Sequence, residues 1–278
     1  MADRLAGDSF ARSLSLRPEG ADAFVAPAVE LGWLYGGQLL ALCIRAATLT
    51  GPDGCQVQSI HAQFVGRGDA AEPLGLDVDR VRDGSALSFR GVRISQNDQV
   101  ILTAQAVLHR PTEGPNYQQP APTTSPPDEP DRWEPSDWVG FDANLGVEVR
   151  EDMALATNPE KADRVYGATR RLWVRLPGLP EGDPVIAQCA MAYVSDMRHG
   201  MALKPALGLP PLGRSAQAAT TDHTMWFHRE PVSPDWMLLD YRPIAAASNI
   251  GLASCHIFDS AGAHLATTTQ DVRYRFDQ

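Results

Sequence analysis

Residues 219–229 read Ala-Thr-Thr-Asp-His-Thr-Met-Trp-Phe-His-Arg, and this stretch is unusually polar for a predicted strand. Because side chains alternate between the two faces of a strand, Thr220 and Asp222 are predicted on one face, and Thr221 and His223 on the other. Neither face is purely apolar, which is unusual for a strand deep inside a sheet. The stretch therefore predicts either a strand with a mixed face or one wall of a polar site, and the rest of the chain decides between them.

The composition is that of a globular protein with a core of its own. The chain has 278 residues, of which 44% are hydrophobic, enough for one large or two ordinary domains. Its formal net charge of −10 argues against nucleic acid or an anionic membrane as the partner. The first residues carry no apolar signal-peptide core, and no long apolar run occurs. We therefore expect a cytoplasmic protein without membrane insertion.

Cysteine and histidine are scattered along the chain. The four cysteines include no Cys-x-x-Cys pair, and the seven histidines do not cluster. This distribution indicates reduced thiols rather than a disulfide framework or a metal site. We expect neither a metal nor a cofactor.

The first 110 residues predict one buried helix and a set of antiparallel strands. Gly36-Gly37 begins a helix that ends before Gly51-Pro52, and its side chains are apolar nearly all round. Gln96-Asn97-Asp98 is a hairpin-type turn. The pattern indicates a sheet wrapped around a helix. Strands are expected at residues 13–18, 22–27, 56–65, 74–82, 86–96 and 99–109.

Residues 111–137 break this pattern, since they contain eight Pro and little aliphatic content. We interpret them as a linker, extended where Pro is dense and partly mobile, with a Pro-rich recognition motif as the alternative. After the linker the order repeats. A second apolar helix is expected to begin at Asp183-Pro184 and to run to Gly200. Strands of this half are expected at residues 144–150, 169–176, 220–229, 236–244, 250–258 and 264–276.

The second half repeats the first in residues as well as in the order of its elements. Phe64 corresponds to Phe227, and Leu102-Thr103-Ala104-Gln105 corresponds to Thr267-Thr268-Thr269-Gln270. Gln105 is thus expected to be the counterpart of Gln270. We interpret the repeat as a duplication that makes a pseudo-dimer within one chain.

Six motifs stand in order along the chain: Tyr35-Gly36-Gly37-Gln38, Arg82-Asp83-Gly84, Ala192-Tyr193-Val194-Ser195-Asp196-Met197, Thr220-x-Asp222-His223-x-x-Trp226-Phe227-His228-Arg229, Trp236 with Leu238-Leu239, and Gln270. Together they resemble the acyl-CoA thioesterase II family, over about residues 30–110 and 185–275. The resemblance implies an α+β protein of two tandem hotdog domains, each an antiparallel sheet wrapped around a long central helix, with sheets that can join into one. The domains would be residues 1–110 and 138–278, joined by the linker at 111–137.

The resemblance also implies a catalytic group made of Asp196, Thr220 and Gln270. In the family, such residues activate a water that attacks the acyl-thioester carbonyl, giving a free carboxylate and coenzyme A. The expected partners are an acyl-CoA substrate and further copies of the chain, in a dimer or higher oligomer. Two departures from the family pattern, Asp271-Val272 and Glu230-Pro231, bear on pocket shape and acyl preference more than on the chemistry.

The residue types fit this chemistry, although each has a plainer alternative. Asp196 is a carboxylate at the end of an apolar helix, where burial and the macrodipole would raise its pKa, as a general base requires. It could equally lie at an exposed helix end, and Gln270 at a solvent-facing strand position. Thr220 is favoured over Thr221 by the motif alone. Gly36-Gly37 could present backbone N–H groups to a carbonyl oxygen or serve close packing.

Three competing interpretations remain for comparison. Gly7-Asp8-Ser9-Phe10 with Asp196-x-x-His199 superficially resembles lipases with a Ser nucleophile, but no buried apolar strand precedes Ser9. A hotdog hydratase would carry an Asp-x-Asn-Pro-x-x-His signature, which is missing. A double-hotdog protein that binds acyl-CoA or acyl chains without turnover is the alternative to an enzyme. In the site of Asp196, Thr220 and Gln270, His223 and His228 are interpreted as structural hydrogen-bonding residues rather than bases.

Overall fold

The computed structural model describes residues 10–28, 34–129, 134–135, 146–152, 155, 170–180, 182–209, 216–229 and 236–276. The elements of the first half follow the predicted order. They are β1 (Arg17–Pro18), β2 (Ala23–Ala26), α2 (Gly36–Leu49), β3 (Gln56–Phe64), β4 (Leu74–Asp83), β5 (Leu87–Gln96) and β6 (Gln99–His109).

The second half begins with short strands and then repeats the helix-and-strands order. Its elements are β7 (Glu134–Pro135), β8 (Glu148–Glu151), β9 (Arg170–Arg175), α5 (Pro184–Ser195), α6 (His199–Ala202), the 3₁₀ turn η2 (Pro205–Leu207), β10 (Ala216–Phe227), β11 (Met237–Ala247), β12 (Ile250–Asp259) and β13 (His264–Phe276).

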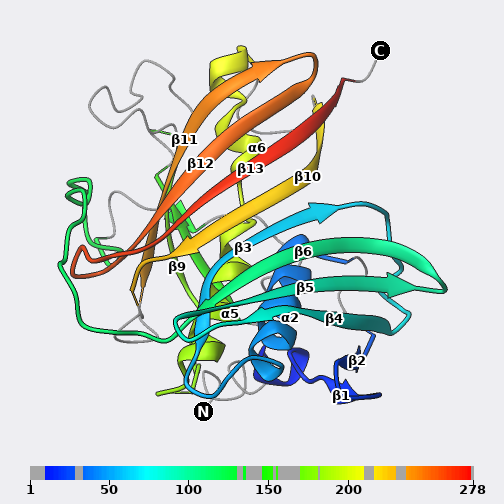
Figure 1. The fold of residues 1–278 in the computed structure, drawn as a ribbon. Helices are drawn as coiled ribbons and strands as arrows, with labels where there is room; N and C mark the ends of the chain where they lie inside the picture. The colour runs from blue at the N-terminus through cyan, green and yellow to red at the C-terminus, as the bar shows by residue number, and fades with distance from the viewer. Residues whose placement is uncertain are drawn as a thin grey trace.

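One antiparallel sheet runs through both halves (Figure 1). The described strands are ordered β1-β2-β4-β5-β6-β3-β10-β13-β12-β11-β9-β8-β7, so the four long strands of each half are neighbours. The halves meet where β3 pairs with β10. The prediction of a mostly antiparallel sheet around buried helices is thus confirmed, and the two sheets form one.

The strand boundaries agree with the predicted ranges to within a few residues, with one clear exception. Residues 10–13 are helical, and only Arg17–Pro18 of the strand predicted at 13–18 pairs with β2. Asn97 and Asp98 both have positive φ, at 47° and 64°, the conformation of a tight hairpin turn. Residues 144–145 and 169, which were also predicted in strands, lie outside the described residues.

The two central helices are buried because nearly all of their side chains are apolar. Ten residues of α2 and nine of α5 are buried, and the two helices pack against each other on one face of the sheet (Figure 1). Asp183 caps α5, since its side chain accepts hydrogen bonds from the backbone N–H groups of Val185 and Ile186. The predicted end of this helix at Gly200 is wrong. Arg198 adopts a left-handed conformation with φ 75°, so α5 ends at Ser195 with Asp196 as its C-cap, and α6 is a separate turn.

Gly37 is a point of close approach between α2 and α5. A Cβ added there would overlap the backbone carbonyl oxygen of Tyr193 and lie 2.6 Å from the Tyr35 ring. The Tyr35 hydroxyl donates to the same carbonyl at 2.8 Å. Only glycine therefore allows the two helices to approach so closely. This approach places the end of α5 beside the beginning of α2.

We expect Gly37→Ala to destabilise the fold, because the added methyl group meets backbone rather than a side chain that can move aside. Overpacking of this kind costs roughly 1–3 kcal/mol. The midpoint of urea unfolding measures the effect, and Gly114→Ala is the matched control, since a Cβ at Gly114 has nothing within 4 Å. Equal midpoints for the two variants would contradict this view of the helix contact.

The linker is anchored along the second half. Residues 110–129 contain neither helix nor strand. Gln118 binds the turn between β12 and β13 twice: its Nε2 donates to the carbonyl of Gly262 at 2.9 Å, and its Oε1 accepts from the N–H of His264 at 3.1 Å. Trp173 Nε1 donates to the carbonyl of Ser125 at 3.0 Å. The lack of helix and strand at 110–129 agrees with the expectation for a Pro-rich segment, whereas residues 134–135, also within the predicted linker, form β7 and pair with β8.

No helix in the described part of the chain is long and apolar enough to cross a membrane.

Candidate active site

The three predicted site residues come together at the junction of the two halves. Gln270 Nε2, on β13, donates to Thr220 Oγ1, on β10, at 2.7 Å. Asp196, at the end of α5, lies close enough to both side chains for each to influence its pKa. The motifs alone therefore selected residues that the fold places side by side.

A pocket of about 330 Å³ opens onto this group. Asp196 and Thr220 form its polar wall, and both belong to the second half of the chain. The rest of the lining comes from the first half, with Arg67 beside three glycines and four apolar side chains: Leu34, Leu39, Phe64 and Ile101. The site is thus completed only when both halves are present, and its surface suits a substrate with an apolar portion.

The carboxylate of Asp196 faces the first turn of α2. A Cβ at Gly36 would lie 2.5 Å from Asp196 Oδ2 and 3.0 Å from the ring of Phe64, so glycine is needed for the carboxylate to sit there. The N–H of Gly37 interacts with the carboxylate, as expected where an anion meets a helix N-terminus. The backbone N–H group of Gly37 thus serves Asp196 in this structure.

Asp196 has the electrostatics of a base. Burial raises the pKa of its carboxyl group to about 7, and the Gln270 amide, the Gly37 N–H and the Thr220 hydroxyl only partly offset this rise. Its Oδ1 is buried and accepts no well-formed hydrogen bond from the residues that the structure describes. A buried carboxylate with a free acceptor and a pKa near neutrality can bind a water and take its proton. The alternative of an exposed helix end is wrong.

Thr220 reaches the site because β10 contains a β-bulge. Thr220 pairs with Val272 and Asp222 with Asp271, which leaves Thr221 as the extra residue. The bulge turns Thr220 to the buried face that also carries His223 and Gln270. The prediction that Thr220 and Asp222 share one face of a regular strand, opposite His223, is therefore wrong. Thr221 instead donates its hydroxyl to the carbonyl of Asp271 at 3.1 Å.

A second layer of buried polar groups lies behind Gln270. His223 Nδ1 is 2.6 Å from Gln270 Oε1, and His223 Nε2 is 3.0 Å from the Ser195 hydroxyl. Burial lowers the pKa of His223 to about 4, so the ring is neutral at neutral pH. The prediction that His223 is a hydrogen-bonding residue rather than a base agrees with this geometry. What the sequence pattern missed is its direct contact with Gln270.

The first half has no equivalent of this polar group. Phe64 and Phe227 correspond, and four residues earlier Ile60 pairs with Ala106 where His223 pairs with Gln270. The counterpart of Gln270 is therefore Ala106, and the assignment of Gln105 is wrong by one residue. That one residue places Gln105 on the opposite face of the sheet.

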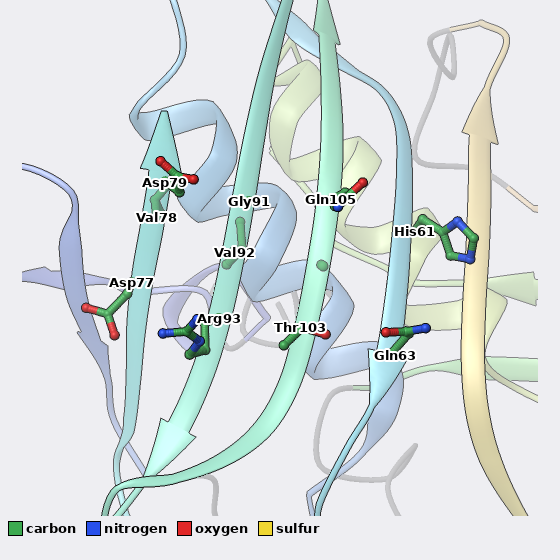
Figure 2. A pocket seen from close by; sticks show the side chains of 11 residues that line it. His61, Gln63, Asp77, Val78, Asp79, Gly91, Val92, Arg93, Thr103 and Gln105 are labelled. Atoms are coloured by element: carbon green, nitrogen blue, oxygen red, sulfur yellow. The ribbon is translucent and has the colours of Figure 1, made fainter. Parts of the chain in front are cut away.

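In the first half, a pocket lies on the outer face of the sheet. Figure 2 shows Gln105 there with Thr103, His61 and Gln63, on strands β6 and β3, in a pocket of about 630 Å³. Asp77 and Asp79 lie on β4, at the far side of this pocket (Figure 2). The pocket lies on the face away from α2 and is separate from Asp196 and Thr220.

An antiparallel sheet around buried helices, with an acid, a hydroxyl and an amide at the junction, defines a hotdog-fold protein with a hydrolase-like site. The chain belongs to the acyl-CoA thioesterase family. Residues 25–109 match the acyl-CoA thioesterase N-terminal domain, and residues 115–274 match the acyl-CoA thioesterase C-terminal domain. The protein is accordingly a thioesterase, an enzyme that hydrolyses thioesters.

Known relatives are similar to this chain over nearly its whole length. Acyl-CoA thioesterase 2 of Haemophilus influenzae is 28% identical over 261 residues, which are 90% of this chain and 91% of the relative. The acyl-CoA thioesterase II TesB2 of Mycobacterium marinum has a similar fold, with a TM-score of 0.79 and 24% identity over 97% of this chain and 98% of that one. A hot dog fold protein from Alicyclobacillus acidocaldarius has a TM-score of 0.76 and 19% identity, covering 97% and 99%.

Proposed function

We propose that the protein hydrolyses acyl-CoA with a water held by Asp196, Thr220 and Gln270. One observation carries the proposal: a buried carboxylate with a pKa near 7 faces a partly apolar pocket beside a hydroxyl and an amide, and one of its oxygens has no hydrogen-bond partner among the described residues. The family supports the same reaction class. It disfavours the alternative of a protein that binds acyl-CoA without turnover.

The proposed reaction uses groups of this chain and one water. Asp196 takes a proton from the water as its oxygen attacks the thioester carbonyl, while Thr220 and Gln270 fix the position of the water. The tetrahedral intermediate then collapses and breaks the carbon–sulfur bond. The coenzyme A thiolate leaves and receives the proton from Asp196, so that the products are a carboxylic acid and free coenzyme A.

The oxyanion of the intermediate requires a donor on the other side of the pocket. Gly36 lines the pocket at the beginning of α2, where the helix dipole favours negative charge. We propose its backbone N–H for this role, because the Gly37 N–H already interacts with Asp196. A bound thioester analogue with its carbonyl oxygen turned away from Gly36 would exclude this assignment.

We further propose that the chain is two hotdog domains in tandem, residues 1–110 and 138–278, joined by the linker at 111–137. The element order and the two family matches, which divide between residues 109 and 115, support this division. A cytoplasmic location stays a prediction and is consistent with the four cysteines, all of which are free. Association into a dimer or higher oligomer also stays a prediction.

The direct test is the release of free thiol from a panel of acyl-CoA esters of increasing chain length. We expect turnover of at least one ester, with no added metal or cofactor. Binding of the esters without release of thiol from any of them would exclude the proposed activity. The same esters incubated without the protein are the control for non-enzymatic hydrolysis.

The activity should depend on pH through Asp196. The carboxyl group must be ionised to take a proton, so kcat/KM should rise with pH and reach half of its maximum near pH 7, where the pKa of Asp196 lies. Initial rates between pH 5.5 and 8.5 measure this profile. A flat profile over that range would show that the titration of Asp196 does not control the reaction.

A further inference from the structure

We propose that His223 is a positioning residue for the reaction: it holds the side-chain amide of Gln270 with its NH₂ group toward Thr220 and Asp196. This inference rests on the proposed function, because it assigns a role to a residue that contacts Gln270 but does not line the pocket beside Asp196. It goes beyond the three residues of the proposed catalytic group.

The contacts form one continuous chain of buried polar groups. The Ser195 hydroxyl is 3.0 Å from His223 Nε2, His223 Nδ1 is 2.6 Å from Gln270 Oε1, and Gln270 Nε2 is 2.7 Å from Thr220 Oγ1. His223 and Ser195 are fully buried, and Gln270 is 2% exposed. Water therefore cannot replace the contacts of His223 with Ser195 and Gln270 without a change in the core.

The chemistry of the amide fixes the direction of each bond. An amide oxygen only accepts hydrogen bonds, so its short contact with His223 Nδ1 requires the proton to be on Nδ1. The ring is neutral, so Nε2 is then an acceptor, 3.0 Å from the Ser195 hydroxyl. That hydroxyl also lies 2.9 Å from the carbonyl oxygen of Ala192, so its one proton is shared between the two acceptors. The ring of His199 packs edge-on against that of His223, with centroids 5.4 Å apart, and restricts its rotation.

The opposite orientation of the Gln270 amide would disrupt the hydrogen bonds of the site. It would bring Gln270 Oε1 against Thr220 and toward the Asp196 carboxylate, where two acceptors repel each other. The Thr220 hydroxyl would then donate to Gln270 instead of facing the carboxylate and the water. Because Gln270 can rotate its amide by half a turn at little cost, a fixed donor at Oε1 is what selects the active orientation. His223 is that donor.

The experiment compares two replacements of His223 by thiol release from acyl-CoA. His223→Leu removes the donor, and we expect kcat to fall roughly 10- to 100-fold with KM nearly unchanged, since misplacement of a water-orienting group costs about this much. His223→Asn keeps a side-chain N–H close to the position of Nδ1, and we expect it to recover most of the lost kcat. His228→Leu is the matched control, because His228 directly follows the same strand but is exposed and contacts Thr267.

A double-mutant cycle shows whether His223 acts through Gln270. Once Gln270→Leu has removed the amide, His223→Leu should cause almost no further loss, so that the two effects are far from additive. Additive losses would overturn the positioning role. Full activity of Gln270→Leu would instead overturn the proposed catalytic group, so the two failures are distinguishable.

A measurement on the unmodified protein covers the case in which the Leu variant does not fold. In ¹⁵N-histidine spectra at neutral pH, His223, assigned from the signal missing in His223→Asn, should show a protonated Nδ1 and an unprotonated Nε2. The opposite tautomer would overturn the proposal.

Discussion

Replacing Asp196 with Asn should lower kcat/KM at least about 100-fold, the usual contribution of a general base, and should at the same time stabilise the folded protein at neutral pH. Asn has the shape of the carboxylate but cannot take a proton from water. It also removes a charge from a largely desolvated position. An inactive variant that is more stable than the wild type is therefore the expected result.

The sign of the stability effect follows from the raised pKa of Asp196. Its pKa is about 7 in the folded state, against the ordinary value of 3.8, so between these values the folded protein holds a proton that the unfolded chain has released. The stabilising effect of this proton is complete below about pH 4 and is lost as the pH rises through 7. Above pH 7 the charge on Asp196 lowers the free energy of unfolding of the wild type by at most about 4 kcal/mol, which corresponds to a pKa raised by about three.

Urea unfolding at pH 5 and pH 8 tests this account. Asp196→Asn should exceed the wild type in free energy of unfolding by more at pH 8 than at pH 5. Asp77→Asn, on the exposed outer face of β4, is the control and should change neither activity nor stability. The same stability difference at both pH values would show that Asp196 is not a costly buried charge, and full activity would remove it from the mechanism.

The second large effect is expected at the β-bulge. Thr220→Val should lower kcat/KM roughly 10- to 100-fold, since it removes the hydroxyl that Gln270 contacts and that faces the proposed water. Thr221→Val is a close control, with the same change of atoms at the neighbouring residue. Its hydroxyl contacts only the carbonyl of Asp271, so its activity should stay within about threefold of the wild type.

Thiol-release kinetics of the two variants, with urea unfolding as a check on the fold, decide between the residues. If Thr221→Val were the inactive variant, the register of β10 at the site would be the opposite of the one described here. If both were fully active, neither hydroxyl would take part in water positioning.

The hydrophobic pattern was sufficient to predict the buried helices and most strands. Residues 36–49 and 184–195 are apolar nearly all round, and such a segment can only be stable inside a fold. The alternation along β5 and β6 and the turn at Asn97-Asp98 predicted the hairpin. The pattern failed for the short strand at 13–18 and for the end of α5. Both depend on a few local backbone conformations rather than on a periodic pattern.

The sequence by itself determined which residue types were available to the site: one acid at the end of an apolar helix, two adjacent Thr residues and a Gln on the last strand. Only the tertiary structure decided how they meet. The bulge at Thr221 brings Thr220 to the buried face, and the glycine contact between α2 and α5 carries Asp196 to it. Strand pairing in the tertiary structure also decided that Ala106, rather than Gln105, is the counterpart of Gln270. The physical reason is that side chains in a strand alternate with a period of two. One extra residue therefore exchanges the faces of everything beyond it, and strand pairing rather than composition shows where that residue lies.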